Sequence, residues 1–248
     1  MGSAIISRIK SQYRVTVSEK DRVRANALKK KFRVKIAGLS EGVKNAHAII
    51  LAVKPQDFDN VLAEIKSSIK NQLVISIAAG ITASYIEKRL GKVRVIRTMP
   101  NLPAQVGQGM TGISKGKYAG QKDLAIAVKL FNKIGETVVV EEKWLDAITA
   151  VSGSGPAYVF LFAEMLTQAA KQLGFSDAVA KKLVLQTLKG SLNLLENSNE
   201  DASVLRERVT SKGGTTQAAL NVFSKHKFQE TFTQALKAAK KRAGELSK

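Results

Sequence analysis

Apolar runs alternate with amphipathic segments in the first part of the chain. Residues 48–53 (AIILAV) and 73–78 (LVISIA) are continuous apolar runs, which is typical of parallel strands covered on both faces. Further strands are predicted at 13–18, 34–36 and 93–99, and helices at 1–11, 21–32, 58–69 and 84–90. Strands that alternate with helices in short units predict a doubly wound, Rossmann-like α/β sheet.

The pattern changes after Asn101. Strands are expected at 107–113 and 138–141, on either side of a helix over 121–134. From Trp144 onward apolar residues recur at helical spacing, which predicts only helices, at 157–173, 177–195, 205–210, 215–223 and 228–246. We therefore place a boundary near Glu142, with an α/β domain over 1–142 and an all-helical domain over 143–248.

One glycine-rich stretch, 209–220 (VTSKGGTTQAAL), stands directly before a helical pattern. Glycine lets the backbone turn sharply, and a threonine just before a helix is a capping residue. The unpaired N–H groups and the dipole at such a helix start favour an anion. The stretch therefore fits an anion site, although an ordinary capped junction between a loop and a helix has the same pattern.

Three segments fall at the carboxyl ends of predicted strands, where open α/β sheets bind nucleotides. They are AVKPQ at 52–56, AAGIT at 78–82 and MPNLP at 99–103. Small residues let a flat ligand approach the backbone, and prolines fix the shape of a loop. A single turn of this kind would be ordinary, but its repetition in successive units favours a nucleotide site.

Composition argues against several classes of protein. The 248 residues include no cysteine and only two histidines, His47 and His226, neither of which has a partner at ligand spacing. No metal site is therefore expected, and without a G-x-S-x-G elbow a serine hydrolase is not expected either. No apolar run approaches the roughly 20 residues of a membrane span, and no secretory signal is found. The lack of cysteine fits a cytoplasmic protein, which is the expectation here. An enzyme of this composition would rely on a bound cofactor.

The net charge of +20, from 40 basic and 20 acidic residues, raises the question of nucleic-acid binding. Most basic residues follow helical surface positions, as Lys237, Lys240 and Lys241 do, and no basic run is interleaved with aromatic residues. We therefore prefer a solvated basic surface to a nucleic-acid interface.

Five blocks, in this order, resemble the pyrroline-5-carboxylate reductase family: AVKP at 52–55, ISIAAGIT at 75–82, RTMPNLP at 97–103, AVSGSGPAY at 150–158 and LRERVTSKGGTTQAAL at 205–220. The resemblance covers nearly the whole chain. It implies an NADPH-binding Rossmann domain, a helical domain for substrate binding and dimerisation, and reduction of the ring C=N of 1-pyrroline-5-carboxylate to L-proline. It also implies a homodimer, with a ring of dimers as the larger assembly.

The resemblance also assigns roles to individual residues. Cofactor contacts are implied for Gly2, Ser18, Ala52, Val53, Lys54, Pro55, Ser76, Ala78, Ala79 and Asn101. The substrate carboxylate and ring nitrogen would be bound by Ser211, Gly214, Thr215 and Thr216, with Thr216 as the catalytic residue through its hydroxyl. The nicotinamide would supply the hydride, so the protein supplies orientation and a carboxylate anchor rather than a strong base.

Two departures from the family pattern affect the expected ligands. Lys212 stands where the family usually has proline, which makes the loop less rigid or adds a cation beside the carboxylate. Glu19 follows Ser18, and an acidic residue there favours NAD, whereas Lys20 and Arg22 favour NADP. NADP is the expected cofactor, with NAD left open.

The largest departure is at the start of the chain. Residues 1–4 (MGSA) match only the end of the family's G-x-G-x-M-G pattern, without the preceding strand and the first two glycines. In the strand order 3-2-1-4-5 that strand is central. We therefore expect a gap between the strands at 13–18 and 48–53, with Met1 an internal methionine of a longer protein. The alternative is a complete chain that binds NADPH poorly.

The sequence leaves three alternative functional classes open. Another Rossmann reductase, such as a β-hydroxyacid dehydrogenase, would need a lysine on the helix after residue 155, where only Lys171 is found, near the end. A truncated family member would keep the fold and the dimer without catalysis. A basic nucleic-acid binder would lose affinity steeply with salt.

Overall fold

The computed structural model describes residues 1–247, which form two compact units. The sheet unit contains Met1–Pro156 and the C-terminal segment from Ala238, and the helical unit contains Ala157–Lys237. The expected α/β class is confirmed, and the described residues after Trp144 contain helices and no strand.

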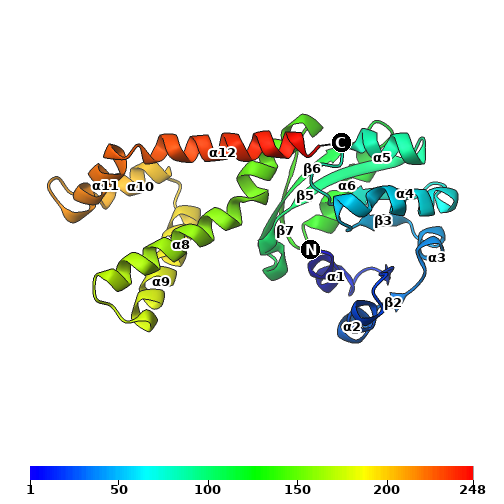
Figure 1. The fold of residues 1–248 in the computed structure, drawn as a ribbon, viewed down its shortest axis with the longest axis horizontal. Helices are drawn as coiled ribbons and strands as arrows, with labels where there is room; N and C mark the ends of the chain where they lie inside the picture. Colours follow the sequence, from blue (N-terminus) through cyan, green and yellow to red (C-terminus); the bar gives the residue numbers. More distant parts are fainter. Residues whose placement is uncertain (248) are drawn as a thin grey trace. The chain divides into compact units, whose positions relative to one another are not determined.

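A five-stranded sheet in the order β3–β4–β5–β6–β7 forms the centre of the sheet unit (Figure 1). Its strands are β3 (Ala48–Leu51), β4 (Leu73–Ser76), β5 (Arg94–Pro100), β6 (Gly109–Lys115) and β7 (Gly135–Val139). Neighbouring strands are parallel, except that β5 and β6 run antiparallel. All four residues of β4 are buried, because a continuous apolar strand in this position is covered on both faces.

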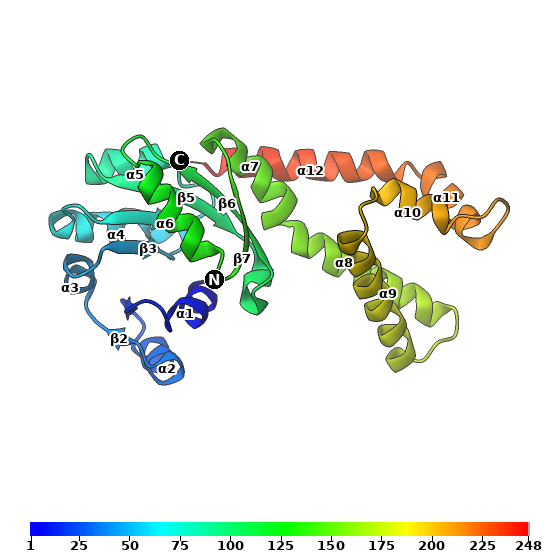
Figure 2. The same cartoon turned by 180° about the vertical axis from the view of Figure 1, so that it is seen from behind.

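Side chains of β4 alternate between two apolar layers, one on each face of the sheet. Leu73 and Ile75 pack with residues of two helices, α1 (Gly2–Ile9) and α6 (Gln121–Phe131). Val74 packs in the opposite layer, with residues of α3 (Leu39–Lys44), α4 (Phe58–Ile65) and α5 (Ala83–Leu90). Figure 1 and Figure 2 show the two sides of this arrangement, which leaves the ends of the strands open for loops.

The sheet is divided, as the missing first strand predicts. Strands β1 (Thr16–Val17) and β2 (Lys35–Ile36) pair in parallel as a separate two-stranded sheet, joined by α2 (Arg22–Phe32). Across residues 1–247, neither β1 nor β3 pairs with a strand on its other edge. The expected gap is therefore confirmed, and it falls where the strand order of a doubly wound sheet reverses.

A short helical segment leads out of the sheet unit. It comprises η4 (Glu142–Trp144), α7 (Leu145–Ile148), the π-helical turn η5 (Thr149–Gly153) and the start of α8 (Gly155–Gln172). Leu145 and Ala150 are buried. In the structure this segment packs with the sheet unit, although it follows the boundary proposed at Glu142. The boundary between two domains at Glu142 therefore stays a prediction.

The helices of the helical unit leave much apolar surface uncovered in the single chain. They are α8 up to Gln172, α9 (Asp177–Asn197), α10 (Ala202–Arg208), α11 (Thr215–Lys225) and the first part of α12 (Phe228–Glu245). The buried residues on α9 are Ala180 and Val184, and within the described chain α8, α10, α11 and α12 have none. Such a surface requires a partner.

Several boundaries differ from those expected. The predicted strand at 13–18 is reduced to β1, since only these residues meet a partner strand. The strand expected at 138–141 is found at Gly135–Val139, where β6 provides the pairing. The predicted helix at 205–210 is α10, Ala202–Arg208. Neither α3 nor α7 was expected, because six and four residues are too few to show a helical period.

The expectation that no apolar segment approaches membrane length is wrong. The helical stretch Glu142–Gln172 has 31 residues and includes an 18-residue window with a mean hydropathy of 1.2, so it is long and apolar enough to span a membrane by length and composition. One such helix is weak support for a membrane span, because interface and core helices share this composition.

Candidate cofactor and substrate sites

The carboxyl ends of β3 and β4 and the start of α1 lie at the edge of the sheet where a dinucleotide site is expected. A Cβ atom placed on Gly2 would lie 3.6 Å from the Cβ atom of Ala52, so the first turn of α1 packs against the end of β3. The first amide groups of a helix lack intrahelical acceptors, and such groups bind phosphate. Gly2, for which a cofactor contact is implied, therefore lies where the start of α1 contacts the end of β3.

The loops at this edge expose small residues and backbone. Ala52, Lys54 and Pro55 after β3 are exposed, and so is Ala79 after β4. A flat ring or a phosphate chain can approach these atoms without meeting a large side chain. The residues present therefore fit a dinucleotide in the general position that the sequence predicts.

Other predicted cofactor residues shape the loops from inside. The Ser76 hydroxyl accepts a hydrogen bond from the Ala78 amide, at 3.3 Å, and both residues are buried. Val53 is partly buried against the apolar layer beneath α4. These positions act on the loop conformation, and their contact with a cofactor stays a prediction.

Asn101 joins three parts of the sheet unit. Its side-chain amide donates to the Ser152 carbonyl at 3.0 Å, and its side-chain oxygen accepts from the Met110 amide at 2.9 Å. The side chain therefore ties the end of β5 to the start of β6 and to the π-helical turn. Turns of this kind occur frequently at functional sites.

The segment after β1 carries the residues expected near the adenosine ribose. Ser18 is exposed, whereas the Glu19 carboxylate accepts from the Asp21 amide at 3.1 Å and pairs with Arg24 at 3.6 Å. Asp21 caps α2, and the hydrogen bond from the Arg24 amide lowers the pKa of its carboxyl group. The charge of Glu19 is thus already balanced within the protein.

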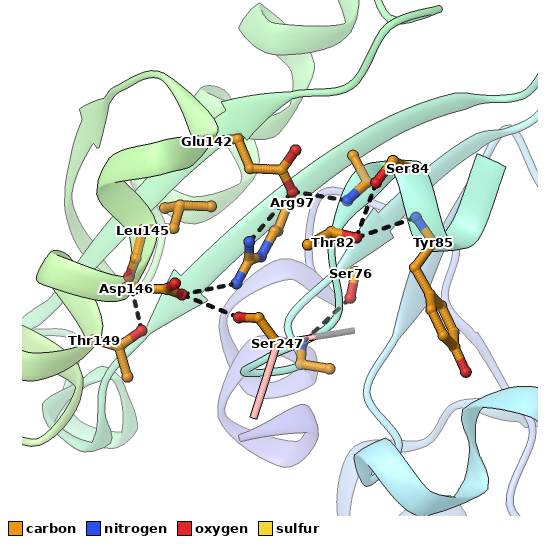
Figure 3. Close-up of polar contacts among 12 residues, drawn as sticks. Ser76, Thr82, Ser84, Tyr85, Arg97, Glu142, Leu145, Asp146, Thr149 and Ser247 are labelled. Carbon is orange, nitrogen blue, oxygen red and sulfur yellow. Dashed lines mark hydrogen bonds and ion pairs between the residues drawn. The ribbon is translucent and has the colours of Figure 1, made fainter. Parts of the chain in front are cut away.

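A buried arginine organises the far side of the β4–α5 loop, defined here as residues 77–82. Arg97 on β5 is 4% exposed and pairs with Glu142 at 3.2 Å and with Asp146 at 3.4 Å (Figure 3). The same Glu142 oxygen accepts the Ala83 amide, at the start of α5, at 2.7 Å. One carboxylate thus connects β5, the segment after the sheet and the first turn of α5.

The C-terminal segment lies against the same loop. Gly80 has a φ angle of +74°, and a Cβ atom there would lie 2.5 Å from the Leu246 carbonyl oxygen. Glycine is required for both reasons. The next residue, Ser247, donates to Asp146 at 3.4 Å. The end of the chain is therefore part of the support for the β4–α5 loop (Figure 3).

The predicted substrate loop belongs to the helical unit. Gly213 has a φ angle of +73°, and the Gly214 amide donates to the Ser211 carbonyl at 3.0 Å, which closes a tight turn before α11. Gly214 is the N-cap, so the prediction of a threonine cap is wrong: Thr215 is the first helical residue. Among residues 1–247 no side chain caps this end, which leaves the amides of the first turn, with the Thr216 hydroxyl on it, for a ligand.

Two surface hollows lie on the sheet unit, and Glu142 lines the second of them. One, of about 480 Å³, is lined by Asn26, Lys29, Lys30, Arg33 and Val34 along α2. The other, of about 650 Å³, lies between β6, α6 and the residues after β7. In the described part of the chain no group of three acidic or histidine side chains is placed to hold a metal ion.

The parallel strands with helices on both faces and open carboxyl ends define a Rossmann-type fold. A family model described as NADP oxidoreductase, coenzyme F420-dependent, matches residues 1–80, and one described as pyrroline-5-carboxylate reductase dimerisation matches residues 142–246. A reductase of that name from Synechocystis sp. is 38% identical, covering 100% of this chain and 95% of the relative. The chain belongs to the pyrroline-5-carboxylate reductase family.

Solved structures of the family have the same fold. The pyrroline-5-carboxylate reductase from Coxiella burnetii superposes with a TM-score of 0.91 and 36% identity, covering 100% of this chain and 94% of the other. The Plasmodium falciparum pyrroline carboxylate reductase, solved with NADP bound, has a TM-score of 0.89 and 28% identity, with the same coverage. The resemblance inferred from five sequence blocks is confirmed.

Sequence reasoning missed the group formed by Arg97, Glu142, Asp146 and Ser247. One signal was available: Arg97 lies in the interior of a predicted strand, directly after Val95 and Ile96, and a buried arginine requires acidic partners. Glu142 and Asp146 are four residues apart and so lie on one side of a helical segment. Their pairing with β5 depends on the fold and could not be assigned from the sequence.

Proposed function

We propose that this chain reduces 1-pyrroline-5-carboxylate to L-proline with a nicotinamide cofactor. The observation that carries the proposal is the match to reductases of this name over the whole chain, in both units. The bound cofactor supplies the hydride. The edge beside Gly2, Ala52 and Ala79 holds it, and the amides before Thr216 bind the substrate carboxylate while the Thr216 hydroxyl hydrogen-bonds the ring nitrogen.

No strong base is needed in this chemistry. An imine with a protonated ring nitrogen accepts hydride readily, so orientation and charge balance are the contributions that the protein makes. The loop before α11 provides backbone amides and hydroxyls, which suit a carboxylate. Lys212, exposed in this loop, adds a positive charge next to the same group.

The first test is oxidation of NADPH by the purified chain. We expect NADPH consumption that depends on pyrroline-5-carboxylate, with proline as the product. A second candidate, a family member without catalysis, is favoured by the divided sheet, because β1 and β3 lack a common central strand in the described residues. Titration of the chain with NADPH separates the two: an absence of binding supports the second candidate.

The preferred cofactor is NADPH. The negative charge of Glu19 is partly balanced by Arg24 and by the Asp21 amide, which weakens its preference for a free ribose hydroxyl over a 2′-phosphate. Lys20 pairs with Asp57 at 3.0 Å, and Arg22 supplies positive charge for a 2′-phosphate. We expect Arg22→Ala to lower the ratio of kcat/KM for NADPH to that for NADH by about 10-fold or more, the loss of one charge-assisted hydrogen bond. An unchanged ratio would contradict this assignment.

We also propose a cytoplasmic homodimer that assembles into a ring of dimers. The uncovered apolar helices and the match to the dimerisation model support the association of two copies. The absence of cysteine fits a reducing compartment.

A further inference from the structure

The β4–α5 loop is held at both ends by hydrogen bonds to its backbone. At its start, the Ala78 amide donates to the Ser76 hydroxyl. At its end, the Ala83 amide donates to Glu142, which is 59 residues away in the sequence. Between these points, Ala79 is exposed at the edge where the cofactor is expected. The conformation of the loop therefore depends on a residue outside it.

Glu142 is fixed in turn by Arg97. The guanidinium group is buried, and its two terminal nitrogens face the carboxylates of Glu142 and Asp146. Because one guanidinium group faces both carboxylates, it stabilises them in one arrangement. A carboxylate at the first turn of α5 also interacts favourably with the helix dipole. The ion pair with Arg97 and the dipole of α5 thus both stabilise the Glu142 oxygen at the Ala83 amide.

We propose that Glu142, held by Arg97, is a positioning residue that fixes the β4–α5 loop in the shape that receives the nicotinamide cofactor. The inference rests on the proposed function, since the loop is assigned to the cofactor there. Glu142 acts through the Ala83 amide and does not itself touch the cofactor. Loss of the carboxylate releases the start of α5 and lets the loop adopt other conformations, only some of which bind NADPH.

The test compares three variants with the parent chain. Glu142→Ala removes the acceptor, whereas Glu142→Gln keeps an amide oxygen at the same reach. Glu141→Ala is the matched control, because its exposed carboxylate pairs with Lys143 and not with the loop. Hydrogen–deuterium exchange of the cofactor-free chains reports on the loop, and calorimetric titration with NADPH, together with kcat and KM for both substrates, reports on its use.

We expect Glu142→Ala to speed exchange in peptides covering 77–86 while peptides from β4 and α6 stay protected. NADPH binding should weaken by about 10-fold, the effect of losing one hydrogen bond that supports the bound conformation. The KM for the imine should change little. Glu142→Gln should restore most of the affinity, and Glu141→Ala should match the parent chain. If Glu142 contributed to stability alone, Glu142→Ala would lower the melting temperature without raising the KM for NADPH relative to the KM for the imine.

Two outcomes overturn the inference. Exchange of the loop that is the same in Glu142→Ala and the parent chain would show that the carboxylate does not hold it. A loosened loop with unchanged NADPH affinity would show that its shape does not matter for the cofactor. If Glu142→Ala does not fold, Glu142→Asp replaces it, since the shorter side chain keeps the charge but loses the reach. If the parent chain oxidises NADPH and the Glu142 variants behave like it, only the inference about Glu142 is contradicted. If the parent chain binds no NADPH, the proposed function is contradicted as well.

Discussion

The double variant Phe162→Lys with Leu166→Lys is expected to be monomeric at micromolar concentration, whereas the parent chain forms a dimer. Val159, Phe162 and Leu166 are spaced three and four residues apart and form an apolar stripe on α8, with exposed fractions of 52%, 43% and 37% in the single chain. Glu164, Gln168 and Lys171 form a polar stripe on the opposite side of the helix. This arrangement predicts that the apolar stripe is covered by a second copy.

The expected effect is large because each substitution occurs twice in a dimer. Burial of a phenylalanine or leucine contributes about 1.5–3 kcal/mol, so four such side chains contribute about 6–12 kcal/mol. A dissociation constant between micromolar and nanomolar corresponds to roughly 8–12 kcal/mol. The lost contribution is therefore comparable with the whole free energy of association, and the four buried lysines add a desolvation penalty.

Light scattering coupled to size exclusion measures the result. The control is Gln168→Lys with Gln172→Lys, which adds the same charges at the same spacing on the exposed polar side of α8. We expect this control to stay dimeric. A parent chain that is monomeric, or a Phe162→Lys/Leu166→Lys variant that is as dimeric as the control, would contradict the assignment of this stripe to the interface.

Thr216→Ala is expected to lower kcat/KM for the imine by about 10–150-fold, which corresponds to about 1.5–3 kcal/mol for a lost charge-assisted hydrogen bond. The hydroxyl is carried by the second residue of α11, next to the first-turn amides. The affinity for NADPH should stay nearly unchanged, because the cofactor residues belong to the sheet unit. Steady-state kinetics with each substrate varied in turn separates the two effects.

Thr216→Ser is the control for this prediction. It keeps the hydroxyl and removes only a methyl group, so most of the activity should return. Normal kinetics of Thr216→Ala toward the imine would rule out the assigned role. A loss of NADPH affinity equal to the loss in kcat/KM would instead indicate a general disturbance of α11.

The sheet could be predicted from sequence because its central strands are continuous apolar runs. Burial on both faces removes the polar alternation, so residues 73–76 could be assigned before their neighbours were known. The gap beside β3 was predictable from the strand order of a doubly wound sheet, which has a central position that no strand of this chain fills. β1 was harder to delimit, because the length of a strand depends on its partner.

The candidate sites were predictable where local chemistry decides them. The glycines before α11 were recognised from the local sequence alone. The N-cap, however, is Gly214 rather than a threonine, because the start of the helix depends on the turn that precedes it. The support of the β4–α5 loop was not predictable. It joins β5, Glu142 and Leu246, which are far apart in the sequence and meet only after the sheet unit has folded.

We expect this chain to transfer a hydride from a nicotinamide cofactor to the ring imine of pyrroline-5-carboxylate. The direct test incubates the chain with NADPH carrying deuterium at the transferable position, and mass spectrometry then locates the label. Hydride transfer to the imine predicts L-proline with one deuterium on the ring carbon that is bonded to nitrogen and does not bear the carboxylate, formed in equal amount to the NADPH consumed. Unlabelled proline, or no proline while NADPH is bound, would contradict it.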